Sequence, residues 1–312
     1  MTETNQKIYK DVIIIGAGPA GMTAALYASR ASLDTLMIEQ GVPGGELMNT
    51  AEVENYPGFG KIAGPDLALK FFESASAFQA ETVYGQVDKV EVEGQEKIVK
   101  VGQAIYSAPV LILATGANHR KLGVPGEEKL TGQGVSYCAV CDGFFFKDKD
   151  IVVVGGGDSA VEEGTYLTQF AKSVTIIHRR DELRAQKILQ DRAFNNPKMN
   201  FIWDSVVEEI VGTDHVEGVQ VRNVKTNEVS QLSTQGVFVY VGLIPNSDLV
   251  KDLDITDAQG WVKTDDFMQT RLSGIYAIGD IRAKHLRQVA TAVGDGSIAG
   301  QHAYEYIQSI NE

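Results

Sequence analysis

The chain has 312 residues and a hydrophobic content of 44%, which suits a soluble globular protein with room for two domains. Its net charge of -13 makes nucleic acid and anionic membrane surfaces unfavourable main partners, so we expect neither. Residues 1–10 are polar and lack the apolar stretch of a secretory signal, and the longest apolar runs are strand-sized. We therefore expect a cytoplasmic protein that does not enter a membrane.

Residues 12–39 carry the pattern of a nucleotide-binding βαβ unit. An unbroken run of valine and isoleucine predicts a buried parallel strand over 12–15, followed by a helix over 21–29 and a strand over 35–39. The glycine loop after the first strand lets the backbone approach a pyrophosphate at the helix N-terminus. Its candidate binding residues are Gly16, Gly18, Pro19, Ala20 and Gly21.

Glu39 ends the second strand of this unit. Its carboxylate can accept hydrogen bonds from a ribose diol and repels a 2'-phosphate, so the site favours FAD or NAD over NADP. The alternative is a glycine turn that only packs helix on strand. The complete strand, loop, helix and strand order makes that the weaker interpretation.

The next segment lacks a nucleotide motif. Residues 41–66 are rich in Gly, Pro and Asn and predict an extended loop, and a helix is expected over 65–79. Residues 82–106 alternate between apolar and polar side chains, which predicts an antiparallel ribbon. A buried strand then begins at Val110 and ends in a glycine turn at Gly116.

The same order of elements then repeats, with the second glycine loop starting at Gly155, 139 residues after Gly16. The expected elements are a strand over 151–154, a helix over about 159–170, a strand over 173–178, a ribbon over 201–232 and a strand over 236–242. We therefore predict an α/β protein with two Rossmann-like nucleotide-binding domains. Each would have a three-layer ββα-type arrangement.

Residues 246–312 are too few for a third domain. They contain a strand that ends at Asp280 and a closing helix over roughly 289–309. Asp280 can bind a ribityl hydroxyl, and the helix N-terminus can stabilise negative charge on a reduced flavin. We expect this tail to complete the first domain, so that 1–118 and 246–312 bind FAD and 119–245 form an inserted NADPH domain.

The second glycine loop predicts a different nucleotide. Where the first unit has Glu39, this one has basic residues, whose guanidinium groups suit a 2'-phosphate. We therefore expect NADPH here in preference to NADH, although a solvated basic strand end is the alternative. The candidate residues are Gly155, Gly157, Asp158, Ser159 and Ala160 in the loop and His178, Arg179, Arg180 and Arg184 after the strand.

Cys138 and Cys141 are the only cysteines and form a C-x-x-C motif. In such motifs the first thiol often has a lowered pKa and attacks disulfides, and the adjacent Asp142 can act as a general acid or base. Zinc needs four ligands, and the chain has no second ligand pair, so we expect no metal. Spacing alone leaves open that the two cysteines are buried and inert.

Seven motifs together resemble the low-molecular-weight, bacterial-type thioredoxin reductases over about residues 8–308. They are Gly16–Gly21, Glu52–Gly58, Ala114–Gly116, Cys138–Phe145, Gly155–Ala160, His178–Arg180, and Ala277–Asp280 with Arg287 and Gln288. The resemblance implies a homodimer that carries FAD and NADPH and reduces thioredoxin. It also implies that Cys141 faces the flavin, that Cys138 attacks thioredoxin with Asp142 as proton donor, and that Phe144 and Phe145 contact thioredoxin.

The resemblance adds FAD-binding candidates that the glycine loop does not supply. They are Gly44, Gly45, Glu46, Asn55, Val87, Asp280, Arg287, Gln288 and Val289. The chain departs from the family pattern at Val140, where threonine is usual, and at Glu46, where glutamine is usual. Two other functions fit the motifs less well: a flavin reductase for a peroxidase system, and a nucleotide-binding redox sensor whose cysteines switch a partner interface.

Overall fold

The computed structural model describes residues 7–50 and 52–311. The chain forms two compact units: the first unit comprises Met1–Asn118 and Ile244–Glu312, and the second unit comprises His119–Leu243. The second unit is thus inserted in the first. Within the described ranges, no helix is both long enough and apolar enough to cross a membrane.

The first unit is built around a five-stranded parallel sheet with the strand order β21-β10-β2-β3-β6. Its strands and helices are β1 (Lys7–Tyr9), β2 (Val12–Ile15), α1 (Pro19–Arg30), β3 (Thr35–Glu39), η1 (Gly45–Asn49), β4 (Glu52–Val53), β5 (Ile62–Ala63), α2 (Gly64–Ser76), β6 (Glu81–Tyr84), β7 (Lys89–Glu93), β8 (Glu96–Val101), β9 (Ala104–Ala108), β10 (Val110–Leu113), η3 (Asp248–Leu253), β21 (Ile275–Ala277), η4 (Gly279–Ile281) and α6 (Val289–Asn311).

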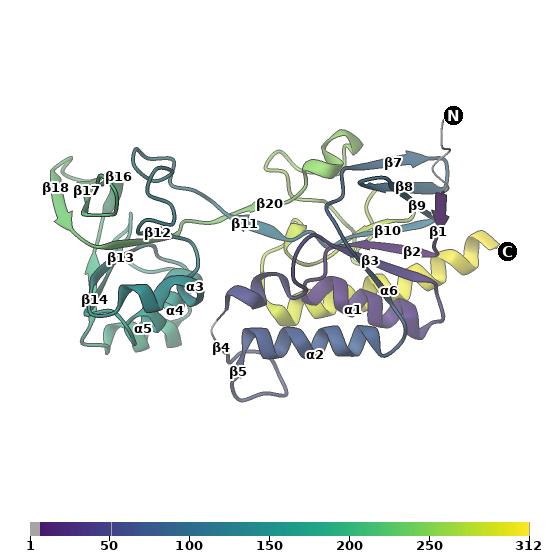
Figure 1. Cartoon of the computed structure of the whole chain (residues 1–312), viewed down its shortest axis with the longest axis horizontal. Helices are drawn as coiled ribbons and strands as arrows, with labels where there is room; N and C mark the ends of the chain where they lie inside the picture. Colours follow the sequence, from purple (N-terminus) through teal and green to yellow (C-terminus); the bar gives the residue numbers. More distant parts are fainter. Residues whose placement is uncertain (1–6, 51, 312) are drawn as a thin grey trace. The chain divides into compact units, whose positions relative to one another are not determined.

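Alternate residues of the central strands supply the two cores of this unit. Val12 and Ile14 of β2 pack with the helices α1 and α6, whereas Ile13 and Ile15 pack with the ribbon of β7, β8 and β9. Both faces of the sheet are therefore buried, which is why the strand reads as unbroken apolar sequence. Figure 1 shows the resulting three layers, with the helices on one face and the ribbon on the other.

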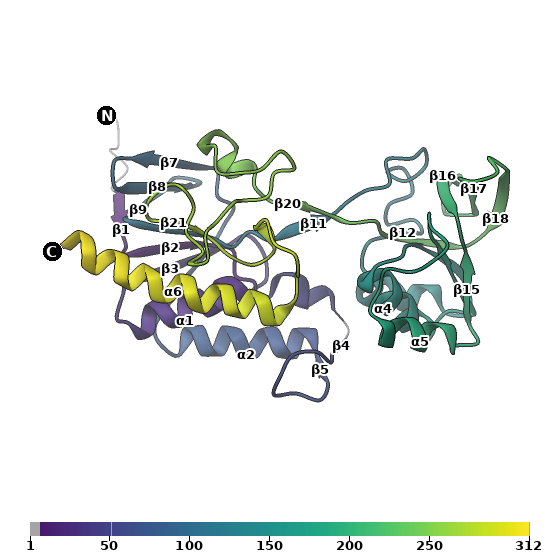
Figure 2. The same cartoon turned by 180° about the vertical axis from the view of Figure 1, so that it is seen from behind.

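Helices α1 and α6 lie side by side, although they come from opposite ends of the chain (Figure 2). Glycines permit this close approach: a Cβ at Gly296 would lie 2.4 Å from the Ala20 carbonyl oxygen, and one at Gly300 would lie 2.8 Å from that of Ala24. The tail of the chain therefore completes the first unit on its helical face.

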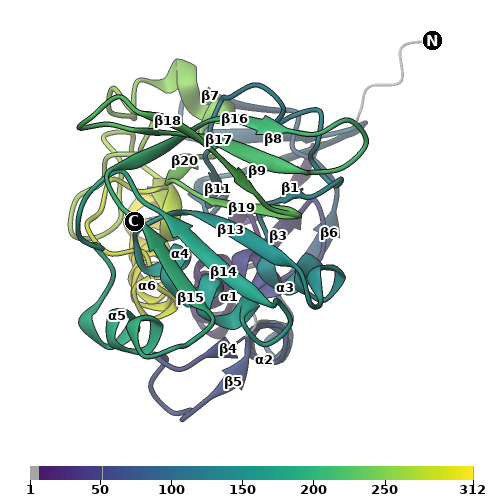
Figure 3. The same ribbon diagram turned by 90° about the vertical axis from the view of Figure 1, so that its left-hand side faces the viewer.

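The second unit repeats this plan around the parallel sheet β12-β19-β13-β14-β15. Its strands and helices are β12 (Val135–Ser136), α3 (Ala139–Asp142), η2 (Gly143–Phe146), β13 (Asp150–Gly155), α4 (Asp158–Leu167), β14 (Ser173–Ile177), α5 (Lys187–Phe194), β15 (Met199–Ile202), β16 (Ser205–Val211), β17 (Gly218–Asn223), β18 (Val229–Ser233) and β19 (Gly236–Tyr240). Figure 3 shows α4 and α5 on one face of the sheet and the ribbon β16–β18 on the other.

The chain passes between the units twice, and the two passages pair with each other. Strands β11 (Ala117–His119) and β20 (Leu243–Pro245) form a two-stranded sheet. Backbone hydrogen bonds continue this pairing, from Arg120 N–H to the Gly242 oxygen at 2.8 Å and from Asn246 N–H to the Gly116 oxygen at 3.0 Å. The two ends of the inserted segment therefore lie next to each other.

The predicted fold class is confirmed, but two local predictions were wrong and one helix was missed. The predicted ribbons over 82–106 and 201–232 begin too early, because residues 82–84 and 201–202 lie in β6 and β15, which pair in parallel with β3 and β14. The expected loop over 41–66 contains the short helix η1 and the small hairpin of β4 and β5. The helix α5 (Lys187–Phe194) was not predicted, because its one buried residue, Ala193, leaves almost no apolar stripe.

Candidate active site and nucleotide sites

The first glycine loop is packed on one side and open on the other. A Cβ at Gly16, where φ is +104°, would lie 2.4 Å from the Ala114 oxygen, and one at Gly21 would lie 2.0 Å from the Gly16 oxygen. At Gly18 a Cβ would meet nothing within 4 Å. Gly18 caps α1 without a side-chain hydrogen bond, Pro19 follows, and the first turn holds no acid. This uncapped helix N-terminus fits a pyrophosphate.

The Glu39 carboxylate is held against this loop. Its Oε2 accepts a hydrogen bond from the Ala17 N–H at 2.8 Å, and its Oε1 accepts one from the Gly41 N–H at 2.9 Å. A carboxylate can accept about four hydrogen bonds, so it keeps capacity for a ribose diol. The residue thus has the chemistry to bind an unphosphorylated ribose.

The turn at Gly44 and Gly45 lies against the first glycine loop. The Gly44 N–H donates to the Ala17 oxygen at 2.8 Å, and a Cβ at Gly45 would lie 3.3 Å from the Gly18 Cα. Both glycines have positive φ, +136° and +55°, which side chains rarely adopt. Glu46 follows as an exposed residue in the first turn of η1.

Two further predicted residues meet although they are far apart in the chain. The Asn55 Nδ2 donates to the Gln288 Oε1 at 2.9 Å. Val289, the first residue of α6, packs against the small core that contains Leu47. Val87 is buried in the core between the sheet and the ribbon.

Asp280 lies in η4, directly after β21, in a crowded electrostatic setting. Burial raises the pKa of its carboxyl above the usual range, the Lys284 and Arg287 cations oppose this shift, and Glu46 adds to it. Arg287 is itself held in place, because its guanidinium lies 3.7 Å from the Trp261 ring centroid and its Nε donates to the Asp280 carbonyl oxygen at 3.2 Å.

A buried ion cluster that the sequence did not predict supports this turn. The Asp295 carboxylate accepts hydrogen bonds from the Gly279 N–H at 2.9 Å, the Arg282 Nη1 at 2.8 Å and the Lys284 Nζ at 2.9 Å. Gly279 adopts φ of +70°, and a Cβ there would lie 3.0 Å from the Ala20 Cβ. The cluster therefore fixes the Gly279–Asp280 turn close to the first loop. The sequence did not predict this cluster, because Asp295 appears there only as a single acidic residue within the closing helix.

The second glycine loop is built in the same way. A Cβ at Gly155 would lie 2.4 Å from the Tyr240 oxygen and 2.8 Å from the Ala160 Cβ, whereas one at Gly157 would meet nothing within 4 Å. Gly157 caps α4 without a side-chain hydrogen bond, and Ser159 is exposed. The open side of this loop again fits a pyrophosphate.

The segment after β14 folds back onto this loop. The Asp158 carboxylate accepts hydrogen bonds from the Gln186 N–H at 2.7 Å and from its Nε2 at 2.9 Å. The Arg184 N–H donates to the Gly156 oxygen at 2.7 Å. These bonds hold the basic segment beside the loop, and sequence spacing gave no sign of Gln186.

His178 and the three arginines have different positions. His178 is 4% exposed, and a Cβ at Gly156 would lie 2.4 Å from its ring, so the imidazole lies directly under the loop. Burial lowers its pKa, and the cations of Arg184, Arg180 and Arg179 lower it further. All three arginine residues are exposed. The three guanidinium groups, whose charges all act on His178, have the chemistry to bind a 2'-phosphate, while the neutral imidazole supports the loop.

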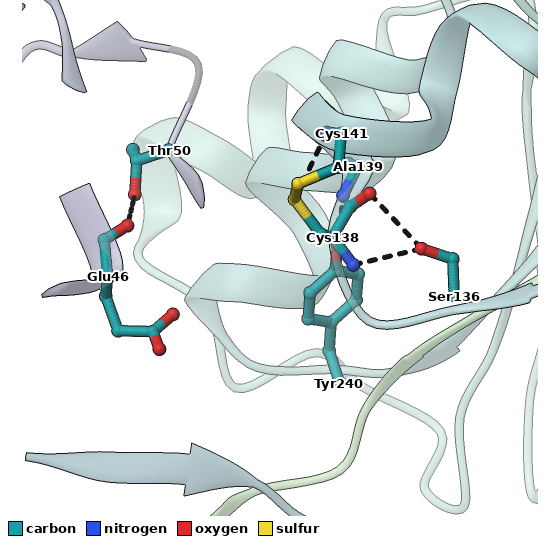
Figure 4. The surroundings of a disulfide bond; sticks show 7 residues. All are labelled: Glu46, Thr50, Ser136, Cys138, Ala139, Cys141 and Tyr240. Carbon is teal, nitrogen blue, oxygen red and sulfur yellow. Dashed lines mark hydrogen bonds between the residues drawn. A yellow bond between two sulfur atoms is a disulfide. The ribbon is translucent and has the colours of Figure 1, made fainter. Parts of the chain in front are cut away.

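The cysteines form a disulfide at the start of α3, with their Cα atoms 5.4 Å apart (Figure 4). The Cys141 N–H donates to the Cys138 Sγ at 3.1 Å. The Ser136 Oγ accepts from the Cys138 N–H at 3.0 Å and donates to the Cys138 oxygen at 3.2 Å, and the Ala139 N–H donates to the Tyr240 hydroxyl at 3.1 Å. The short helix is therefore anchored at its first residues.

Surface features of the second unit surround this disulfide. Cys141 is exposed, whereas Cys138 and Asp142 are partly buried. Phe144 and Phe145 are 67% and 69% exposed, unlike the buried Phe146. A surface cavity of about 440 Å³ is lined by eleven residues that include Asp142, Phe145 and Ser136. Among the described residues, no group of three or more His, Cys, Asp or Glu side chains could hold a metal ion.

Comparison with known proteins agrees with this arrangement. Residues 10–296 match the pyridine nucleotide-disulphide oxidoreductase family. The chain belongs to this family. Within it, the chain is 59% identical over 311 residues to a thioredoxin reductase of Listeria monocytogenes and 56% identical over 315 residues to one of Bacillus subtilis. These alignments cover 99% of this chain and 97% and 98% of the two relatives.

Solved structures of the family give the same result. A thioredoxin reductase of Lactococcus lactis is 53% identical, covers 96% of this chain, is itself covered to 99% and has a TM-score of 0.95. Another, named T. acidophilum thioredoxin reductase, is 34% identical with a TM-score of 0.92, and the match covers 97% of this chain and all of that one. The two-unit nucleotide-binding architecture is therefore that of this family.

Proposed function

We propose that this protein is an NADPH-dependent thioredoxin-disulfide reductase, a flavoprotein oxidoreductase. The observation that carries the proposal is the disulfide between its only two cysteines, in a chain that has the Glu39 carboxylate beside its first nucleotide loop and three arginines beside its second. The high identity to thioredoxin reductases over nearly the whole chain supports thioredoxin as the substrate.

The first unit would hold FAD and the second NADPH. FAD supplies two-electron redox chemistry between the hydride of NADPH and a disulfide. In the first unit, the uncapped N-terminus of α1 would bind pyrophosphate and Glu39 the ribose, while Asp280 and the start of α6 would contact the remainder of FAD. In the second unit, the Gly157 loop and the three exposed arginines would bind the phosphates of NADPH.

The dithiol would transfer electrons to thioredoxin by exchange. The Cys138 thiolate attacks one sulfur of the thioredoxin disulfide, the other thioredoxin sulfur leaves as a thiolate, and a mixed disulfide forms. Cys141 then attacks the Cys138 sulfur, which releases thioredoxin as a dithiol and restores the Cys138–Cys141 disulfide. The Cys141 N–H, which donates to the Cys138 Sγ, would stabilise the attacking thiolate, and Asp142 would provide the proton for the leaving thiolate.

Contacts outside the dithiol would select the partner. The exposed Phe144 and Phe145 offer aromatic surface next to the cysteines, which suits an apolar patch on thioredoxin. As in the family that the sequence resembles, we expect a homodimer. A reversible cysteine pair also suits a reducing compartment, so we expect the cytoplasm.

The test is an assay of purified holoprotein. We expect a flavin spectrum, and steady NADPH oxidation only when oxidised thioredoxin is added. In Cys138→Ser, thioredoxin reduction should be lost while NADPH still bleaches the flavin in a single turnover. NADPH oxidation that never depends on thioredoxin would favour a redox sensor instead, and full turnover in Cys138→Ser would overturn the role of that sulfur.

A further inference from the structure

Tyr240 is the last residue of β19 and belongs to none of the motifs that identify the site. It is 8% exposed, and its hydroxyl accepts the Ala139 N–H at 3.1 Å, beneath the disulfide (Figure 4). We propose that Tyr240 is a positioning residue for the dithiol, acting through the first residue of α3. The proposal rests on the dithiol being the reactive pair of the proposed function.

Tyr240 is fixed from two sides, which makes its hydroxyl a rigid anchor. Its backbone pairs with Gly155 in the parallel sheet, close enough that a Cβ at Gly155 would lie 2.4 Å from its carbonyl oxygen. Its ring packs edge-on against His119, with 5.6 Å between the centroids and 82° between the planes. Both contacts lie within the second unit. The hydroxyl therefore has little freedom to follow a movement of α3.

The anchored N–H belongs to the segment that sets the geometry at sulfur. Ala139 is fully buried and is the first residue of α3, so its N–H has no acceptor within the helix. Two residues later, the Cys141 N–H points at the Cys138 Sγ. If Tyr240 lost its hydroxyl, a buried donor would lose its acceptor, and α3 would shift to find another. The Cys141 N–H would then stabilise a Cys138 thiolate less well.

Comparison of the two units separates this role from nucleotide binding. Ala114 occupies the corresponding position in the first unit, because a Cβ at Gly16 would meet the Ala114 oxygen at 2.4 Å, just as one at Gly155 would meet that of Tyr240. The backbone contact with a glycine loop thus needs no side chain. The first unit has no cysteine, whereas the second uses the phenol hydroxyl to hold the dithiol helix.

The test measures the reactivity of Cys138 in the full-length holoprotein. In a Cys141→Ser background Cys138 is the only thiol, and its rate of alkylation by iodoacetamide against pH gives its pKa. Adding Tyr240→Phe keeps the ring and removes the hydroxyl. We expect the alkylation profile to move up by roughly one pH unit, so that the rate near pH 7 falls several-fold. Asp142, which follows Cys141 in the chain, and Glu127, whose Oε1 accepts from the Tyr137 hydroxyl at 2.7 Å, are the same in both proteins.

Tyr276→Phe in the Cys141→Ser background is the matched control, because Tyr276 is a buried tyrosine of the first unit whose hydroxyl lies 3.5 Å from the His302 oxygen. It should leave the profile unchanged. An unshifted profile in Tyr240→Phe would overturn the proposal. Loss of NADPH binding in Tyr240→Phe would also overturn it, because the hydroxyl would then be needed for the structure of the whole second unit and not for the dithiol in particular. Neither readout involves thioredoxin, so the proposed function stands or falls separately.

Discussion

One residue position distinguishes the two nucleotide loops. Glu39 is the last residue of β3, and His178 directly follows β14, the corresponding strand of the second unit. Glu39 contacts Ala17 of the first glycine loop, and His178 contacts Gly156 at the corresponding place of the second. The carboxylate does so through a hydrogen bond, and the imidazole through ring packing. Because burial and three nearby arginines lower the pKa of His178, the ring is neutral at pH 7. At this position the second site thus lacks the negative charge with which Glu39 would repel a 2'-phosphate.

This difference predicts how the arginines select the nucleotide. Replacing Arg179 and Arg180 with alanine should raise the KM for NADPH by about 10- to 100-fold, because each guanidinium loses a charge-assisted contact with the phosphate. The KM for NADH should hardly change. Lys225→Ala is the control, since Lys225 pairs with Asp181 and Asp204 on the same unit. Equal losses for both nucleotides would contradict the assignment.

Lys97 is a buried lysine. In the part of the chain that the structure describes, its amine contacts backbone oxygens and an aromatic ring, and no carboxylate. Its side chain is 1% exposed, and its Nζ donates to the Gln95 oxygen at 2.9 Å and the Pro109 oxygen at 2.7 Å and lies 5.6 Å from the Tyr306 ring centroid. Burial lowers the pKa of Lys97 to about 8. The amine therefore loses its proton in the folded protein at a lower pH than in the unfolded chain.

The sign of the resulting pH dependence follows from the bound protons. Above about pH 8 the unfolded chain binds more protons at Lys97 than the folded one, so stability should rise with pH by up to about 3 kcal/mol toward pH 10.5. The urea unfolding midpoint of the wild type, measured from pH 7 to 10, should therefore rise relative to that of Lys97→Met as the pH rises. Lys70→Met, at an exposed position on α2, should follow the wild type. Parallel curves for Lys97→Met would rule out this role.

At the scale of elements, two adjacent glycines of the second loop have different roles: Gly156 is needed for packing, and Gly157 leaves space for the nucleotide. A Cβ at Gly156 would collide with the His178 ring, whereas one at Gly157 meets no protein atom within 4 Å. We expect Gly156→Ala to lower the thermal midpoint of the apoprotein by several degrees, a loss of ~1–3 kcal/mol typical of overpacking.

Gly157→Ala should instead leave the thermal midpoint unchanged, because its φ of -93° suits alanine, and should weaken NADPH binding by filling the open side of the loop. Calorimetric titration with NADPH would measure this. If both variants lost stability equally, the open side of the loop would have to be occupied by protein.

Helices and strands were predictable where the buried residues form a clear apolar pattern in the sequence. The strand β2 matches its predicted range of 12–15, and the closing helix predicted over 289–309 extends over Val289–Asn311. The short helix at Ala139–Asp142 was not predictable, because four residues carry no periodicity. Tyr240 and Asp295 were also missed, since a hydrogen bond across distant segments depends on tertiary packing that spacing does not encode.

At the scale of the whole molecule, the repeat of loop and strand was sufficient to predict two domains of one type with the second inserted. The parallel pairing of β6 with β3 and of β15 with β14 was not, because residues 82–84 and 201–202 continue directly into the segments that form the ribbons. Sequence periodicity reports which face of a strand is buried, but it does not report the direction of the neighbouring strand.

The paired passages between the units predict that the inserted unit can fold alone. A fragment of residues 119–243 has its ends adjacent, since the Arg120 N–H lies 2.8 Å from the Gly242 oxygen, and it contains both faces of its own core. We expect cooperative thermal unfolding by circular dichroism and NADPH binding in titration calorimetry. A fragment without cooperative unfolding would show that the second unit depends on the first.

The position of β21 also has a consequence for the order in which the protein forms during synthesis. Residue Ile275 pairs with Leu111 of β10, so the first sheet keeps an open edge until the ribosome has added the inserted unit and about 30 further residues. The inserted unit can complete its own sheet before then. We therefore expect the inserted unit to fold first in the nascent chain, and the sheet of the first unit to be completed only when β21 has been synthesised.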